Sequence, residues 1–274
     1  MSKTATIILN RNLPEPTNKL CEHLNHYDSK DNDVYVVEAG SDQDKISKFC
    51  TWHVNDNQVN EIGLRYARGM NYGLCQLVNE KKWDRYDYFF LLTNDTELPK
   101  METIKTLSSI LDNHPRVGII SPCSKRWGEK LLLAKQKTKY FWFIHNNAYF
   151  IRKDFIDTVR EYNNPNHMNF LFDGTNFRGY HLESELIAKA YANDWAAAIT
   201  SEVYAEENEA YLLNKNSLIK TDDYDKNLKL YINEGNEWLK RKYGFNSKWT
   251  MNQYVKNFYD NFFYFYPEYK KYRL

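Results

Sequence analysis

The stretch Tyr86-Asp87-Tyr88-Phe89-Phe90-Leu91-Leu92-Thr93-Asn94-Asp95-Thr96-Glu97 decides the fold. Its apolar run is typical of a buried strand, and it ends in two carboxylates, Asp95 and Glu97, one residue apart. In an extended segment, side chains two positions apart point to the same side. We therefore expect both acids at the carboxyl end of a strand, which is where an open α/β sheet binds its ligands. Two carboxylates placed there can bind a divalent cation, which in turn can bind a diphosphate.

Segments typical of strands and helices alternate outward from this stretch. Apolar and β-branched runs predict strands at residues 4–9, 33–37, 49–54, 88–92 and 117–121. Helices are expected from Pro14 and near residues 101–113, and residues 65–73 are expected to form a loop that enters another helix. This alternation is typical of βαβ units and predicts an α/β fold with a mostly parallel sheet. The polar loops that follow the strands should meet at one edge of that sheet.

The second half of the chain is less regular. Residues 140–151 are aromatic and extended, and 196–204 are expected to form a strand. Helices are expected at 155–162 and 186–191. From about residue 209 the chain becomes charged and aromatic, with apolar residues at helical spacing. We therefore predict a catalytic domain at 1–208, with a nucleotide-binding half at 1–121 and an acceptor half at 122–208, followed by a helical, aromatic-rich extension at 209–274.

The composition excludes several classes of protein. Of the 274 residues 42% are apolar, which is enough for a core, and a net charge of +1 gives no reason to expect a nucleic-acid partner. No segment approaches the roughly 20 apolar residues that cross a bilayer. The four cysteines have no metal-type spacing, which favours reduced thiols in a cytoplasmic protein.

Five segments resemble those of the GT-A glycosyltransferases of the family 2 type, and they occur in the same order. They are 7–12 (IILNRN), 36–42 (VVEAGSD), 68–73 (RGMNYG), 91–97 (LLTNDTE) and 183–186 (ESEL). The resemblance implies a GT-A, Rossmann-like fold. It implies an inverting, metal-dependent hexosyltransferase that moves a sugar from a nucleotide-diphospho-sugar to a hydroxyl on a glycan, lipid or protein. UDP-hexose is the favoured donor.

The same resemblance implies a set of donor-binding residues. Asn10 and Arg11 would line the base and ribose, Glu38 would contact ribose or base, and Asp42 would accept hydrogen bonds from the base edge. The alternative for the two acids is a solvated turn in which Gly40 supplies the backbone geometry.

Further donor contacts are expected from the segment 69–73 and from the end of the central strand. The loop that contains Gly69 and Asn71 would approach the nucleotide, with Arg65 or Arg68 near the diphosphate. Asn94 would also contact the donor, next to Asp95. The alternative for the glycine-rich segment is a plain helix start.

The metal site is expected at Asp95 and Glu97, with Mn²⁺ or Mg²⁺, because hard oxygen ligands suit hard cations. The alternative is that both acids are solvated or cap the following helix. Many relatives add a histidine near residues 203–206, where this chain has none. Glu206, Glu207 or His181 are the candidates to replace it.

Inversion needs a general base that takes the proton of the acceptor hydroxyl. The resemblance places Glu183 at the catalytic acid's position, and a one-residue shift in alignment would select Glu185 instead. Both acids also suit the start of a helix, where the helix dipole stabilises them by about 0.3–1 kcal/mol each.

Weaker candidates for sugar contacts are His145, Asn146, Asn147, Trp127 and the turn at 173–176. The aromatic tail at 249–274, with Lys270, Lys271 and Arg273, suits packing on the catalytic domain, a dimer contact or peripheral contact with a membrane surface.

Two other functions fit parts of the pattern. A GT-A-like protein that binds nucleotide or sugar without catalysis is favoured by the missing histidine. A sugar nucleotidyltransferase shares the fold, but such enzymes carry a glycine-rich loop after the first strand, and residues 10–14 (NRNLP) do not provide one.

Overall fold

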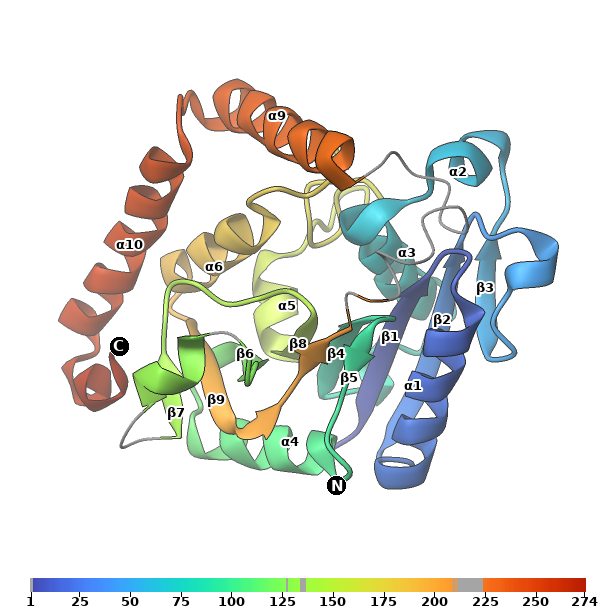
Figure 1. The fold of residues 1–274 in the computed structure, drawn as a ribbon. Helices are drawn as coiled ribbons and strands as arrows, with labels where there is room; N and C mark the ends of the chain where they lie inside the picture. Colours follow the sequence, from blue (N-terminus) through green and yellow to red (C-terminus); the bar gives the residue numbers. More distant parts are fainter. Residues whose placement is uncertain (1, 127, 134–136, 209, 211–223) are drawn as a thin grey trace.

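The computed structural model describes residues 2–126, 128–133, 137–208, 210 and 224–274 (Figure 1). Its centre is an eight-stranded sheet that carries helices on both sides. In spatial order its strands are β3 (Cys50–Val54), β2 (Asn32–Ala39), β1 (Thr4–Asn10), β4 (Tyr88–Thr93), β8 (Ala148–Arg152), β6 (Val117–Cys123), β9 (Ala196–Tyr204) and β7 (Thr138–Tyr140). A separate two-stranded ribbon pairs β5 (Thr96–Glu97) with β10 (Glu206–Glu207).

The sheet is parallel from β3 to β4, the part that was expected to bind the nucleotide. β1 pairs in parallel with both β2 and β4, and β2 pairs in parallel with β3. β8 runs antiparallel between β4 and β6, and β7 runs antiparallel to β9. The predicted strands and the mostly parallel α/β fold are therefore confirmed. β4 is buried along nearly its whole length, which explains its continuous apolar sequence.

The helices follow the strands in the expected alternation. They are α1 (Pro14–Tyr27), α2 (Asn57–Ile62), α3 (Arg65–Asn79), α4 (Thr103–Asn113), α5 (Lys153–Val159), α6 (Leu182–Ala192), α9 (Tyr224–Tyr243) and α10 (Lys248–Phe265). One prediction is wrong: residues 65–73 are not a loop, because α3 begins at Arg65. Its glycines let the helix lie close to the sheet, since a Cβ on Gly69 would be 2.3 Å from Leu9 Cδ1.

The C-terminal extension is helical, as predicted, and α10 lies along α6 (Figure 1). Its buried side chains join the hydrophobic core of the sheet domain; they are Trp238, Leu239, Met251, Val255, Tyr259, Phe262 and Phe263. The chain end returns to the sheet, where the Leu274 backbone N–H donates to the Tyr140 carbonyl at 3.2 Å. The tail therefore packs on the domain that contains the sheet, the first of its three expected roles. The proposed boundary at residue 209 lies beside residues outside the described part.

Within the described part of the chain, no helix is both long and apolar enough to cross a bilayer. The four cysteines are free thiols, and three of them, Cys21, Cys75 and Cys123, are buried.

Candidate active site

The carboxyl ends of β1, β2 and β4 meet at one edge of the sheet because the three strands are parallel and in register. Asn10 at the end of β1 lies opposite Glu38 of β2. Leu9 lies opposite Thr93, the last residue of β4. The loops that leave these strands therefore converge, and they bring together residues that are far apart in the sequence.

Glu38 stabilises this edge of the sheet through buried hydrogen bonds. It is fully buried, and its two carboxylate oxygens accept hydrogen bonds from Asn10 Nδ2 at 3.0 and 2.9 Å. The Ser47 backbone N–H donates at 2.8 Å, and the Ser41 hydroxyl donates as well. These four bonds use the acceptor capacity of the carboxylate. The resemblance implied that Glu38 contacts the nucleotide directly. These hydrogen bonds indicate instead that Glu38 stabilises the loop after β2.

Asn10 extends the network to β4. Its Oδ1 accepts from Asn94 Nδ2 at 2.9 Å and from the Leu13 backbone N–H at 3.2 Å. Asn94 directly precedes Asp95, so the buried Asn10 amide couples the first strand's loop to the acidic turn. Asn10 and Asn94 thus lie together with their amides bonded to the protein, and their expected contact with the donor stays a prediction.

Arg11 and Asp42 lie on the outer side of the same loops. Arg11 Nη2 donates to the carbonyls of Asn60 and Glu61, at 3.1 and 2.8 Å. Burial lowers the pKa of the Arg11 guanidinium. Asp42 is partly exposed and forms an ion pair with Lys45 at 2.8 Å. Both residues therefore lie at the loops that follow β1 and β2, and their contact with a nucleotide stays a prediction.

Asn71 and Arg68, from α3, contact the segment that precedes α6. Asn71 is fully buried; its Nδ2 donates to the carbonyls of His167 and Phe172, and its Oδ1 accepts from the Leu171 and Phe172 backbone N–H groups. Arg68 Nε donates to the Gly174 carbonyl at 2.8 Å. Gly69 packs on Leu9, so this part of α3 has a structural role. The structure gives no support to the expectation that the segment 69–73 approaches the nucleotide.

Asp95 and Glu97 do not lie on one extended strand. Asn94 and Asp95 form a turn between β4 and β5, so the two-residue alternation does not hold across it. Asp95 is 6% exposed, whereas Glu97 is exposed. Asn208 joins the two, because its backbone N–H donates to the Asp95 carbonyl at 2.9 Å and its Nδ2 donates to Glu97 Oε1 at 2.6 Å.

The two acids suit a cation that is held mainly by phosphate oxygens. Among the described residues, no three His, Cys, Asp or Glu side chains come close enough to form a metal site on their own. Mg²⁺ is usually bound through one or two protein carboxylates, substrate phosphates and water. Of the candidates for a third ligand, Glu206 accepts from the Ser124 hydroxyl at 2.7 Å and the Lys125 backbone N–H at 2.6 Å. Glu207 lies opposite Thr96 in the β5–β10 ribbon.

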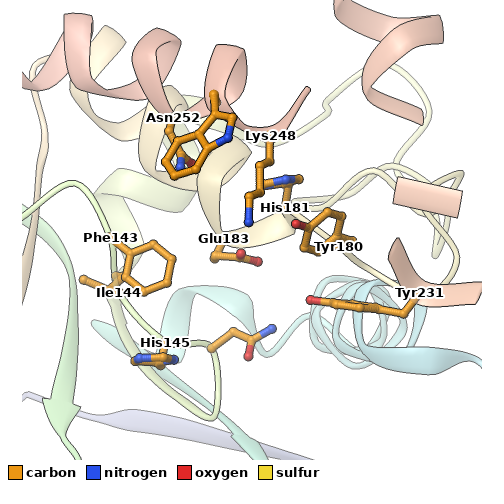
Figure 2. Close-up of a pocket in the computed structure, with 11 residues that line it drawn as sticks. Phe143, Ile144, His145, Tyr180, His181, Glu183, Tyr231, Lys248 and Asn252 are labelled. Atoms are coloured by element: carbon orange, nitrogen blue, oxygen red, sulfur yellow. The ribbon is translucent and has the colours of Figure 1, made fainter. Parts of the chain in front are cut away.

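Glu183 lies in the first turn of α6 and faces a pocket of about 400 Å³ (Figure 2). Burial raises the pKa of its carboxyl to about 7, and a hydrogen bond from its own backbone N–H partly opposes this shift. Tyrosines surround it: burial first, and the charge of Glu183 second, raise the pKa values of Tyr66 and Tyr180. A carboxylate with a pKa near the working pH, open to a pocket, has the properties of a general base.

Glu185, two residues further along, has a different environment. Its carboxylate is 2% exposed, accepts from the Tyr243 hydroxyl at 2.6 Å and pairs with Lys242 Nζ at 2.6 Å. Lys242 also pairs with Asp173 at 2.6 Å. Glu185 and Asp173 thus fasten α9 to the catalytic domain, and of the two candidate bases only Glu183 faces the pocket.

The weaker candidates fall into three groups. His145 and Asn146 line the pocket, and His145 Nε2 lies 2.8 Å from Glu129 Oε1. Asn147 is buried beside the acidic turn, where its carbonyl accepts from the Thr96 hydroxyl at 3.0 Å. Neither polar atom of the Asn147 amide has a hydrogen-bond partner in the described part of the chain. Trp127 lies outside the described residues.

Sequence reasoning missed the pocket residues of the extension, namely Tyr231, Lys248, Trp249 and Asn252. They follow Glu183 by about 50 to 70 positions, and no local motif marks them. The only available signal was the helical spacing of the aromatic tail, which indicated packing and not where the helices would lie.

No family model matches the sequence, and no curated protein matches it. Among solved structures, residues 1–349 of S. aureus TarS in complex with UDP-GlcNAc are similar, with a TM-score of 0.53, 14% identity, and coverage of 96% of this chain and 73% of that chain. The longer TarS structure has a TM-score of 0.53 and 13% identity, and the match spans 43% of its length.

The mannosyltransferase PcManGT from Pyrobaculum calidifontis, in complex with GDP-Man and Mn²⁺, has a TM-score of 0.50 and 10% identity, with coverage of 93% of this chain and 73% of that chain. Identities this low establish the fold alone. These structural matches, together with the strand order and the C-terminal helices, show that this chain has the GT-A glycosyltransferase fold.

Proposed function

We propose that the protein is an inverting, metal-dependent glycosyltransferase that moves a hexose from UDP-hexose to a hydroxyl acceptor. The observation that carries the proposal is the position of Glu183. Its carboxyl, with a pKa of about 7, faces a pocket of about 400 Å³ in a GT-A fold whose sheet edge bears Asp95 and Glu97. The free thiols suit the cytoplasmic location expected from the sequence.

The donor is assigned to the edge formed by β1, β2 and β4. TarS structures contain UDP or UDP-GlcNAc, and PcManGT contains GDP-Man with Mn²⁺, which supports a nucleotide-sugar here. Asp95 and Glu97 would hold Mn²⁺ or Mg²⁺, and a cation bound there neutralises charge on the departing nucleoside diphosphate. The buried amide of Asn147, which lacks partners in the described chain, is assigned to a hydroxyl of the donor sugar.

Glu183 is assigned the role of base. Its carboxylate takes the proton of the acceptor hydroxyl as that oxygen attacks the anomeric carbon. The new bond joins the acceptor oxygen to the anomeric carbon, while the bond from that carbon to the phosphate oxygen breaks on the opposite face. Attack from the opposite face inverts the anomeric configuration. Burial supports the role, because a pKa raised to about 7 makes the carboxylate a stronger base while about half of it stays ionised near pH 7.

The test is release of nucleoside diphosphate from a panel of UDP- and GDP-sugars, with and without Mn²⁺ and with a set of hydroxyl acceptors. We expect release with a UDP-hexose, dependent on the cation. Glu183→Gln should bind UDP normally and lose turnover, since the change affects only the transition state. Glu202→Gln is the matched control, because Glu202 is exposed on β9. Normal turnover by Glu183→Gln would overturn the assignment.

A binding protein without catalysis is the second candidate. It is favoured by the missing histidine near residues 203–206, and among the described residues no three His, Cys, Asp or Glu side chains come close enough together to hold a metal ion. Thermal-shift titration with UDP and Mn²⁺, followed by a donor-hydrolysis assay, separates the two functions. Stabilisation by UDP without hydrolysis or transfer would support the binding protein.

A further inference from the structure

The pocket in front of Glu183 has two walls of different origin. One consists of residues 143–146 and 180–183 of the catalytic domain, and the other comes from α9 and α10 (Figure 2). The second wall is held in place by the ion pairs of Lys242 with the buried Glu185 and the partly buried Asp173. The pocket is therefore preformed, and its volume of about 400 Å³ is in the range of small-molecule sites.

The lining of this pocket contains a buried polar atom that lacks a partner. His181 is 5% exposed, and its Nε2 has no hydrogen-bond partner in the described part of the chain. His181 also adopts a left-handed backbone conformation, with φ at +67°, which costs energy for a residue other than glycine. A ligand with hydroxyl groups would supply the missing partner of His181 Nε2.

Aromatic rings form much of the remaining surface, on both walls. Phe143 is 37% exposed and Trp249 is 67% exposed, so their faces are open to a ligand. Tyr180 and Tyr231 lie edge to face, with centroids 5.0 Å apart, and both line the pocket. Aromatic faces combined with directed polar groups suit a sugar, whose C–H face packs on a ring while its hydroxyls bond at the edge.

The pocket has one fixed positive charge, at Lys248. Burial and the nearby Lys248 charge lower the pKa of His181 to about 4, so His181 is neutral at pH 7. Lys248 Nζ points into the pocket from the first turn of α10 (Figure 2). It lies 5.2 Å from the centre of the Trp249 ring, and it forms no ion pair with any residue that the structure describes. An anionic group on the ligand would complement this charge.

We propose that this pocket binds the acceptor, and that the acceptor is a glycan whose terminal sugar carries an anionic group, a carboxylate or a phosphate, held by Lys248 while a hydroxyl faces Glu183. The inference rests on the proposed transferase function and specifies its acceptor class. Asp95, Glu97 and Arg11 do not line the pocket, which separates this site from the donor's diphosphate.

The test compares acceptors that differ only in charge: oligosaccharides ending in glucose, glucuronate or glucose 6-phosphate. Binding is followed by tryptophan fluorescence in the presence of UDP, because Trp249 adjoins Lys248, and Trp249→Phe assigns the signal. We expect the glucuronate or phosphate acceptor to bind about two- to fivefold more tightly than the glucose acceptor, the gain of a partly exposed ion pair. The stronger of the two identifies the anion.

Lys248→Met should reduce this preference to about one while UDP affinity stays the same. Lys248→Glu should reverse it in favour of a glucosamine-terminated acceptor. Lys256→Met is the matched control, because Lys256 lies on the same helix and pairs with Asp260 outside the pocket. Equal binding of neutral and anionic acceptors, or a loss of UDP affinity in Lys248→Met, would overturn the proposal. Because binding is measured, that outcome is distinct from failure of the transferase assay.

Discussion

Glu185→Gln is expected to weaken the fold and to leave the chemistry intact. In the structure the Glu185 carboxylate is buried between Lys242 and the Tyr243 hydroxyl, each at 2.6 Å. Glutamine keeps the size of the side chain and one acceptor oxygen, but it removes the charge that Lys242 neutralises. The substitution therefore tests whether Glu185 fastens α9 to the catalytic domain or acts as the base.

The magnitude follows from how far each partner is buried. Removing one partner of a fully buried ion pair costs about 3–5 kcal/mol. Lys242 is 35% exposed and keeps Asp173 at 2.6 Å, so its charge is not left alone. We expect a loss of about 1.5–3 kcal/mol in the free energy of unfolding, which corresponds to a fall of about 3–5 °C in Tm for a chain of this size.

The assay is thermal unfolding by circular dichroism, with nucleoside diphosphate release measured at a temperature well below both transitions. Glu202→Gln is the control for loss of an exposed carboxylate. Glu185→Gln should unfold earlier and retain turnover within a few-fold of the parent. An unchanged Tm together with a hundredfold loss of turnover would mean that Glu185, and not Glu183, is the base.

Four further outcomes are expected. Activity (kcat/KM) should rise with pH through about 7 as Glu183 loses its proton, and Glu183→Gln should abolish that rise. Because the folded state raises this pKa from 4.5, Glu183 makes the folded state bind more protons between about pH 4.5 and 7, and its contribution to stability should fall as pH rises there. The stability of the parent relative to Glu183→Gln should therefore fall over this range, and a difference that does not change with pH would contradict it. Asn71→Ala should cost about 2–4 kcal/mol in urea unfolding, because four backbone groups lose their partner; a loss under 1 kcal/mol would refute the bracing role. Gly69→Ala should cost about 1 kcal/mol through its contact with Leu9 and leave UDP affinity unchanged in calorimetry; weakened UDP binding would restore the nucleotide contact expected from the sequence.

The strand pattern could be predicted because each strand depends on local sequence. The apolar run at 88–92 had to be buried, and the polar residues that follow it had to lie at the sheet edge. The glycine-rich segment 68–73 misled the prediction because glycine serves a loop and a close helix–sheet contact equally well. Only the position of Leu9 against Gly69 distinguishes the two.

The choice between Glu183 and Glu185 also required the tertiary structure. Two residues along a helix differ by about 200° in direction, so one acid faces the pocket and the other faces α9. The sequence contains no sign of which is which, since the partners of Glu185 lie more than 50 residues away. Lys248 was missed for the same reason: its place in the pocket depends on how α10 docks along α6.

In the proposed function, Asp95 and Glu97 bind a cation that in turn binds a nucleoside diphosphate. Calorimetric titration of UDP with and without Mn²⁺, in the parent and in Asp95→Asn and Glu97→Gln, tests it most directly. We predict that Mn²⁺ tightens UDP binding at least about tenfold in the parent and has little effect in either variant. UDP affinity that is indifferent to Mn²⁺ in the parent, or equally enhanced in all three proteins, would contradict the account.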